Sequence, residues 1–204
     1  MYSIDKLALS TVAFAVLLVF VTSCRIEPPP LPAKIIHWKP AQEGKFIGKR
    51  APEFVELTWI NSKPLLLSAL KGKPVLIRFW RVGCPRCEES MPALEYFNRT
   101  YAQKGLVVIG IVIEAQKEVI PDALQKLGVR FPVALDRNGV TLKKYKFENS
   151  NYSSVAVLVD KKGIIRWVHP GGTLDPPRWM GGNEDSPAFD SLEWEINKAI
   201  GEKD

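Results

Sequence analysis

The run of residues 106–113 limits most strongly what this chain can fold into. Its eight residues, Leu-Val-Val-Ile-Gly-Ile-Val-Ile, are almost wholly apolar. A strand that is covered on both faces shows such a continuous run, whereas a strand with one solvated face alternates apolar and polar residues. We therefore predict a sheet that carries helices on both of its faces.

A pair of cysteines lies at a predicted junction of a strand and a helix. Cys84-Pro85-Arg86-Cys87 follows the apolar run 75–80 and precedes a predicted helix over residues 88–104. This order puts the first sulfur at a helix N-terminus, where free N–H groups and the helix dipole favour a thiolate. The second cysteine lies one turn further on, close enough to form a disulfide with it. The arrangement suits thiol–disulfide exchange.

The other periodic segments predict an α/β chain with a mixed sheet. Pro92 is expected to kink the helix over residues 88–104, because proline removes an internal hydrogen bond. The chain should end in a β-hairpin and an amphipathic helix with Phe189, Leu192, Ile196 and Ile200 on its apolar face. The remaining predicted elements are a short strand over 54–57, a helical turn over 65–70, a strand over 75–80, a helix over 117–127 and hairpin strands over 155–159 and 164–168.

The N-terminal segment has the pattern of an export signal. Lys6 precedes an apolar run over residues 7–21, as in the hydrophobic region of a signal peptide. The following Val21-Thr22-Ser23-Cys24 resembles the lipobox of bacterial lipoproteins. That resemblance implies that Cys24 carries a diacylglycerol and becomes the mature N-terminus. The alternative is an uncleaved anchor helix, for which the run is short against a span of about 20 residues. Either topology exposes the domain to a compartment where disulfides persist.

This pattern predicts three parts: a lipoprotein signal peptide over residues 1–23, a proline-rich tether over 24–50 and a globular domain over 51–204. Pro28-Pro29-Pro30-Leu31-Pro32 makes the tether stiff, although residues 35–49 are expected to pack on the domain. If Cys24 carries lipid, Cys84 and Cys87 remain as the one intramolecular pair among the three cysteines. The net charge of +6 is best explained as a solvated basic surface, with proximity to anionic lipid headgroups as the alternative. We predict no nucleic-acid partner.

The domain resembles the TlpA/ResA-type oxidoreductases of the redoxin group over residues 51–168. The resemblance depends on four segments in order: 71–80 (Lys-Gly-Lys-Pro-Val-Leu-Ile-Arg-Phe-Trp), the cysteine motif with Pro92 after it, 105–110 and 155–163. It implies a thioredoxin-like fold with Cys84 as the attacking thiol and Cys87 as the resolving thiol. It also implies no bound cofactor, protein thiols and disulfides as substrates, and a membrane thiol carrier as electron source. The protein would act in the bacterial cell envelope, facing the periplasm or the exterior.

Three positions depart from the family pattern. Ser154, preceded by Ser153, stands where the family has a cis-proline. A cis peptide without proline is costly, so we expect this loop to be trans and the substrate groove to differ. Arg78 replaces the buried acid of thioredoxins, which leaves Glu88, Glu89 or Glu114 as proton acceptor for the resolving thiol. Gly83 stands where tryptophan usually precedes the first cysteine.

The arginines near the motif suggest how its chemistry is tuned. Arg78, Arg81 and Arg86 would lower the pKa of the Cys84 thiol if they lie close to it. A stabilised thiolate favours the reduced form, so the hypothesis is a disulfide more oxidising than that of thioredoxin. The alternative is that a buried carboxylate neutralises Arg78 and that Arg86 points to solvent. The direction of exchange stays open, because most relatives of this type reduce their partners.

Other functions compete with disulfide exchange. Sco-type copper chaperones share the fold, but their cysteines are three residues apart, and only His37 and His169 could supply imidazole ligands here. Peroxiredoxin-type peroxidases place a threonine three residues before the reactive cysteine, where this chain has Arg81. A non-catalytic binding module that kept the fold is the third alternative.

Overall fold

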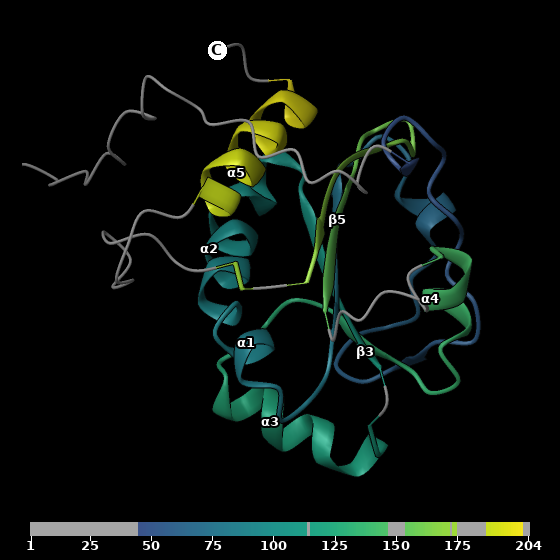
Figure 1. Ribbon diagram of the computed structural model, residues 1–204, viewed down its shortest axis with the longest axis vertical. Coiled ribbons are helices and arrows are strands. Elements are labelled where there is room, and N and C mark those ends of the chain that lie inside the picture. The colour runs from purple at the N-terminus through teal and green to yellow at the C-terminus, as the bar shows by residue number, and fades with distance from the viewer. Residues whose placement is uncertain (1–44, 114, 147–153, 172, 175–186, 202–204) are drawn as a thin grey trace, which may run out of the picture. The chain divides into compact units, whose positions relative to one another are not determined.

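Six strands form one mixed sheet in the computed structural model, which describes residues 45–113, 115–146, 154–171, 173–174 and 187–201 (Figure 1). The strand order across the sheet is β1-β4-β3-β2-β5-β6. Neighbours β2, β3 and β4 run parallel, whereas β1, β5 and β6 each run antiparallel to the strand beside them. The strands are β1 (Thr58–Trp59), β2 (Val75–Trp80), β3 (Val107–Ile113), β4 (Val133–Asp136), β5 (Val155–Val159) and β6 (Ile165–Pro170).

The apolar run 106–113 forms the interior strand β3. It pairs with β2 from Val75↔Val107 to Trp80↔Val112, and all of its residues after Val107 are buried. Because β3 lies between β2 and β4, both of its edges are paired, and the burial of residues 108–113 shows that both of its faces are covered. The prediction of a strand covered on both faces is confirmed.

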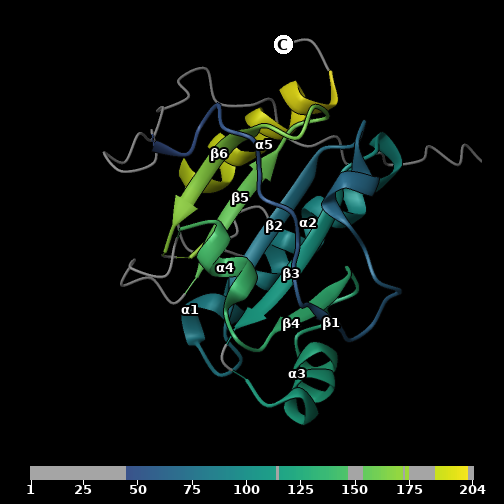
Figure 2. The ribbon, with the colours of Figure 1, turned by 90° about the vertical axis from the view of Figure 1, so that its right-hand side faces the viewer.

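Helices cover both faces of this sheet. In Figures 1 and 2, α2 and α5 lie on one face and the short α4 lies on the other. The helices and helical turns are η2 (Leu67–Leu70), α1 (Pro85–Glu88), α2 (Met91–Tyr101), η3 (Ala102–Lys104), η4 (Lys117–Val119), α3 (Ile120–Lys126), α4 (Val140–Lys144) and α5 (Pro187–Ile200). The predicted α/β class, with a late hairpin followed by a helix, is confirmed.

Each face has its own apolar core. On the face under α2 and α5, Phe97 stacks on Phe189 with 4.6 Å between ring centroids, and Cys87 belongs to the same cluster. On the opposite face, Phe79 meets Tyr145 edge to face at 5.3 Å. The cysteine motif therefore depends on the first of these two cores.

Two local expectations are wrong. Residues 54–57 form no strand, since Glu56 has a φ of 55° and the Glu53 carboxylate accepts N–H bonds from Leu67 and Ser68. The strand forms later, as β1, where Thr58 pairs with Leu135. The predicted helix 88–104 is also divided into α1, α2 and η3. Pro92 has no N–H to donate to the Glu88 carbonyl, so the helix is interrupted about a turn before it.

Two elements were not predicted. Strand β4 has four residues and α4 has five, which is too short for either to show a clear period in the sequence. Within the described ranges, no helix has both the length and the apolar character that a membrane span requires. The predicted signal peptide, Cys24 and most of the predicted tether lie outside the described residues.

Candidate functional site

A disulfide joins Cys84 to Cys87 just beyond the carboxyl end of β2. Cys84 is the extended residue before α1, and its carbonyl accepts N–H bonds from Cys87 at 2.9 Å and Glu88 at 3.0 Å. The Cα atoms of the pair are 5.2 Å apart. Cys84 is half-buried, whereas Cys87 is completely buried. Only the first cysteine is therefore accessible to a partner.

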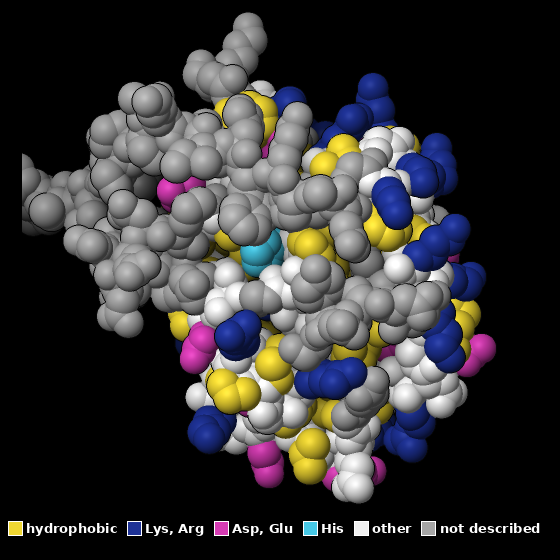
Figure 3. Space-filling view, viewed as in Figure 1, with side chains coloured by type: hydrophobic (Ala, Val, Ile, Leu, Met, Phe, Trp, Pro, Cys, Tyr) yellow, Lys and Arg dark blue, Asp and Glu magenta, His cyan; other side chains and the backbone are white. Residues whose placement is uncertain are grey.

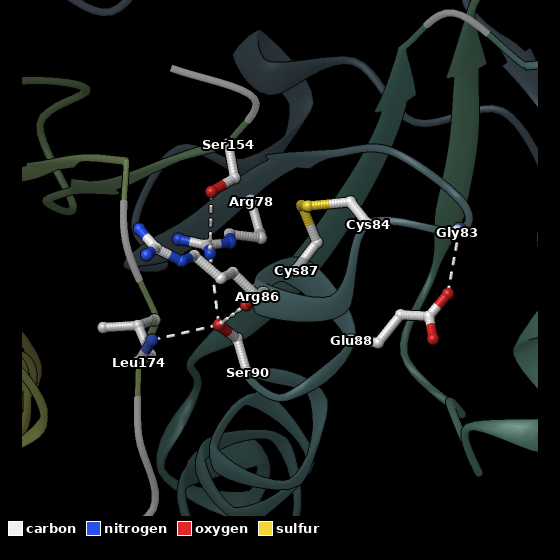
Figure 4. The surroundings of a disulfide bond; sticks show 9 residues. All are labelled: Arg78, Gly83, Cys84, Arg86, Cys87, Glu88, Ser90, Ser154 and Leu174. Carbon is white, nitrogen blue, oxygen red and sulfur yellow. Dashed lines mark hydrogen bonds between the residues drawn. A yellow bond between two sulfur atoms is a disulfide. The ribbon is translucent and has the colours of Figure 1, made fainter.

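Gly83 and Glu88 fix the approach to the first cysteine. Gly83 has a φ of 75°, in the left-handed region that glycine adopts without strain. Its N–H donates to Glu88 Oε1 at 2.9 Å (Figure 4). This turn explains why glycine replaces the bulky residue that the family resemblance led us to expect. It also shows that the Glu88 carboxylate binds the loop before Cys84.

Ser90 links α1 to a distant segment of the chain. Its hydroxyl donates to the Arg86 carbonyl at 3.1 Å and accepts the N–H of the buried Leu174 at 2.9 Å. A second lone pair of the same oxygen accepts a bond from Arg78 at 3.1 Å. All the hydrogen-bonding capacity of this hydroxyl is thus in use.

Arg78 is completely buried and lies beside the disulfide. Its Nη2 donates to the hydroxyls of Ser90 and Ser154, each at 3.1 Å (Figure 4). The directly paired residues on the neighbouring strands are Gly110 and Ala156, so no large side chain projects from either paired position. Burial lowers the pKa of Arg78 to about 10, which leaves the side chain cationic at neutral pH.

His169 lies on the same row of the sheet as Arg78. It pairs with Ala156, which pairs in turn with Arg78, so the three side chains share one face. Its ring stacks on Trp167 with 5.7 Å between centroids. Burial, and secondarily the charge of Arg78, lower the pKa of His169 to about 4. The imidazole is therefore neutral at pH 7.

The structure brings together only some of the residues that the sequence suggested. Arg78 and Ser154 meet beside the motif, Arg81 is half-buried and Arg86 is exposed. Glu89 is also exposed, which makes it a poor partner for the buried Cys87. Ser153, the peptide bond before Ser154, and Glu114 lie outside the described residues.

Sequence reasoning missed Ser90 and Leu174. A serine three residues after the second cysteine carries no signal of its own, and Leu174 is distant in the chain. Among the described residues, no group of three or more His, Cys, Asp or Glu side chains is placed to hold a metal ion.

The sequence matches a family model described as Redoxin over residues 46–178. The thiol-disulfide oxidoreductase ResA of Bacillus thuringiensis subsp. konkukian is 33% identical over 104 residues, which cover 51% of this chain and 60% of ResA. The thioredoxin-like protein YneN of Bacillus subtilis is 32% identical over 126 residues, covering 61% of this chain and 71% of YneN. The DipZ protein of Mycobacterium bovis is 34% identical over 130 residues, but the match spans only 18% of DipZ.

Solved structures give the same result. A putative thiol:disulfide interchange protein DsbE from Chlorobium tepidum is 25% identical with a TM-score of 0.61, covering 76% of this chain and 98% of that one. A putative protein disulfide isomerase from Bacteroides thetaiotaomicron is 27% identical with a TM-score of 0.62, covering 76% and 89%. The thioredoxin-like fold and the resemblance to TlpA/ResA-type redoxins are confirmed.

Proposed function

Because the chain belongs to the Redoxin family, we propose that it is a thiol–disulfide oxidoreductase that acts on cysteines of protein partners. The observation that carries the proposal is the Cys84–Cys87 disulfide, which joins one half-buried and one fully buried cysteine. A structural disulfide has no need of this asymmetry. An exchange pair does, because one sulfur must meet the partner and the other must be kept from it until the mixed disulfide forms.

Exchange needs only the two cysteines and a partner. In the reducing direction the Cys84 thiolate attacks one sulfur of a partner disulfide, which forms a mixed disulfide and releases the other partner sulfur as a thiolate. Cys87 then gives up its proton, which the partner thiolate released in the first step takes up through water, and the Cys87 thiolate attacks Cys84 Sγ. This second step releases the partner dithiol and leaves the Cys84–Cys87 disulfide, so two electrons have passed to the partner. Oxidation of a partner dithiol follows the same steps in reverse.

Arg78 is proposed to favour the thiolate form of this pair. It is a buried cation, and its hydrogen bonds to the hydroxyls of Ser90 and Ser154 hold it beside the motif. A positive charge in a water-poor site stabilises a nearby thiolate more than it would in water. The proposal is that this makes the disulfide more oxidising than a thioredoxin pair. Arg81 and Arg86 would contribute less, since they are more exposed.

The site of action is proposed to be the bacterial cell envelope. The apolar run 7–21 and the lipobox-like Val21-Thr22-Ser23-Cys24 support an anchor made by lipid on Cys24. A protein outside the cytoplasm has no access to cytoplasmic reductants. A membrane thiol carrier is therefore proposed as its electron source.

Trapping of the mixed disulfide tests this function. Full-length Cys87→Ser protein should accumulate partner proteins through Cys84, released by dithiothreitol and identified by mass spectrometry. The matched control is Cys84→Ser, in which the buried Cys87 should capture far less. If both variants capture the same proteins in the same amounts, or neither captures any, disulfide exchange through Cys84 is wrong.

The alternatives are separated by simple assays on the same protein. Tight copper binding by the reduced form would favour a copper-handling role, and rapid peroxide consumption would favour a peroxidase. Full complementation of a deletion strain by Cys84→Ser would favour a binding module without thiol chemistry.

A further inference from the structure

Basic side chains gather at the end of the domain that lies opposite the disulfide. In the sheet, Val75 at the start of β2 pairs with Val159 at the end of β5. The turn between β5 and β6 therefore lies beyond the amino end of β2, whereas the disulfide follows its carboxyl end. Figures 1 and 2 show α1 and this turn at opposite ends of the sheet.

The turn is the centre of this basic surface. Together with the last turns of α5 it lines a pocket of about 370 Å³. The cations that line the pocket are Lys161, Lys162, Arg166 and Lys198, and the carboxylates are Asp160 and Glu195. Asp160 accepts bonds from the N–H groups of Lys162 and Ile164 and forms an ion pair with Arg166 at 2.7 Å, so these two charges cancel. Among the residues that line the pocket, Lys161, Lys162 and Lys198 then outnumber the carboxylate of Glu195.

Neighbouring segments extend the positive charge. The Gly72 N–H donates to the Lys161 carbonyl at 3.0 Å, which brings the exposed Lys71 and Lys73 beside the turn. Arg50 Nη1 reaches the Lys162 carbonyl at 3.5 Å. Figure 3 shows Lys and Arg side chains along the upper right edge of the molecule, and side chains of both signs lower down. Positive charge therefore dominates this end.

The chain also enters the domain at this end. Gly48 donates its N–H to the Ile165 carbonyl, the Lys49 carbonyl accepts the Ile165 N–H, and Ala51 donates to Gly163. Residues 48–50 thus lie against the hairpin, and the chain that precedes them is joined to the domain here. That preceding chain contains the apolar run 7–21. The basic side chains and the segment through which the chain enters the domain therefore lie on the same surface.

We propose that this basic end lies on a membrane surface and binds the phosphate groups of anionic phospholipids. Anionic lipids give a bilayer a negative surface potential that attracts clustered lysines and arginines within about a Debye length, roughly 8 Å in physiological salt. A domain seated in this way presents its disulfide to soluble partners, and it must leave the surface to exchange with the proposed membrane thiol carrier. The inference does not depend on the proposed thiol chemistry.

Lysine acetylation in the presence of lipid vesicles tests the proposal. Full-length protein is reconstituted with vesicles of phosphatidylcholine alone or of phosphatidylcholine and phosphatidylglycerol, and a water-soluble acetylating reagent is applied. We expect Lys71, Lys73 and Lys162 to react about threefold more slowly on the anionic vesicles, with the difference lost in 1 M salt. Lys117 and Lys126 are exposed controls in the η4 and α3 segments, and their rates should be the same on both vesicles.

Charge reversal distinguishes binding through this surface from a general electrostatic attraction between a basic protein and anionic vesicles. Lys71→Glu/Lys162→Glu should abolish the protection of Lys73, whereas the matched Lys117→Glu/Lys126→Glu should leave it intact. Equal rates on both kinds of vesicle would overturn the proposal. So would protection of the same size on neutral vesicles, because the N-terminal segment alone would then explain it. Protection that also covers Lys117 and Lys126 would show an unspecific orientation and would overturn it as well.

Discussion

The two ends of the domain use positive charge in opposite ways. At the disulfide end, Arg78 is completely buried and bonded to the hydroxyls of Ser90 and Ser154. At the hairpin end, Lys71, Lys162 and their neighbours are exposed to water. A buried charge depends on every hydrogen bond that it has, whereas an exposed charge loses little when a contact is removed. The same residue types should thus control stability and chemistry at one end and long-range attraction at the other.

Ser90→Ala should give the largest effect. It removes the acceptor of the buried Leu174 N–H and one of the acceptors of Arg78. Buried donors left without a partner cost about 1–3 kcal/mol each, and more when charged, so we expect a loss of roughly 3–5 kcal/mol in the free energy of unfolding. Denaturant titration of the oxidised protein measures it.

Ser191→Ala is the matched control for that variant. Ser191 is also buried, but within the described part of the chain its hydroxyl accepts one bond, from Trp167 Nε1 at 3.1 Å. Its loss should cost about 1–2 kcal/mol. If the two variants are destabilised equally, Ser90 does not have the linking role that its three bonds suggest.

His169 should make stability depend on pH at the same end of the domain. The pKa of its side chain falls from 6.5 to about 4 on folding, chiefly through burial. The unfolded chain therefore binds the proton first. The contribution of His169 to the free energy of unfolding is constant above about pH 6.5. It decreases as the pH drops towards 4, by about 3 kcal/mol in total.

The measurement is the free energy of unfolding at pH 7 and at pH 4.5, for the native protein and for His169→Gln. The variant should lose less stability over this interval, although Glu53 and Asp160, whose pKa values are also lowered, still contribute to the loss. An identical pH dependence in both proteins would mean that His169 is not held neutral by its surroundings.

Arg78→Met should alter the chemistry rather than the fold. It removes the buried charge while keeping an apolar side chain of similar length, and the loss of one donor to each of the Ser90 and Ser154 hydroxyls should cost about 1–3 kcal/mol. We expect the Cys84 thiolate absorbance of the reduced protein to titrate about one pH unit higher, and the reduction potential to fall by about 30 mV. The control is Arg86→Met within the same motif, whose exposed charge should have a smaller effect. A native Cys84 thiol that titrates at or above about pH 8.5 would contradict the role of Arg78.

The sequence predicted what depends on local pattern. The apolar runs of β2 and β3, the cysteines at a strand-to-helix junction and the kink expected at Pro92 all follow from residues close together in the chain, although the helix is divided there rather than kinked. Strand β4 and helix α4 were missed, because four or five residues do not reveal a period. The predicted strand over residues 54–57 is wrong for another reason. The Glu53 carboxylate accepts a bond from η2, fourteen residues away, and no local sequence pattern predicts this contact.

The surroundings of the motif were predictable only in part. Arg78 was recognised as unusual because it occupies the place of an acid, but its partners Ser90 and Ser154 lie 12 and 76 residues away. His169 was considered for metal binding, and the strand register instead places it on the row of Arg78. Sheet topology creates these contacts between residues that are far apart in the chain, so the sequence pattern alone does not predict them.

Lys71→Glu/Lys162→Glu should give the smallest change in stability and so completes the comparison of the two ends. Both side chains are exposed, and surface substitutions of this kind usually change the free energy of unfolding by less than about 0.5 kcal/mol. The variant should also keep the native reduction potential, because exposed charges at the far end of the sheet are screened beyond about 10 Å. Denaturant titration and a redox titration against glutathione measure both quantities. A potential that shifts as far as in Arg78→Met would mean that the thiol pair responds to the charge of the whole domain, and the contrast between a buried and an exposed cation would not hold.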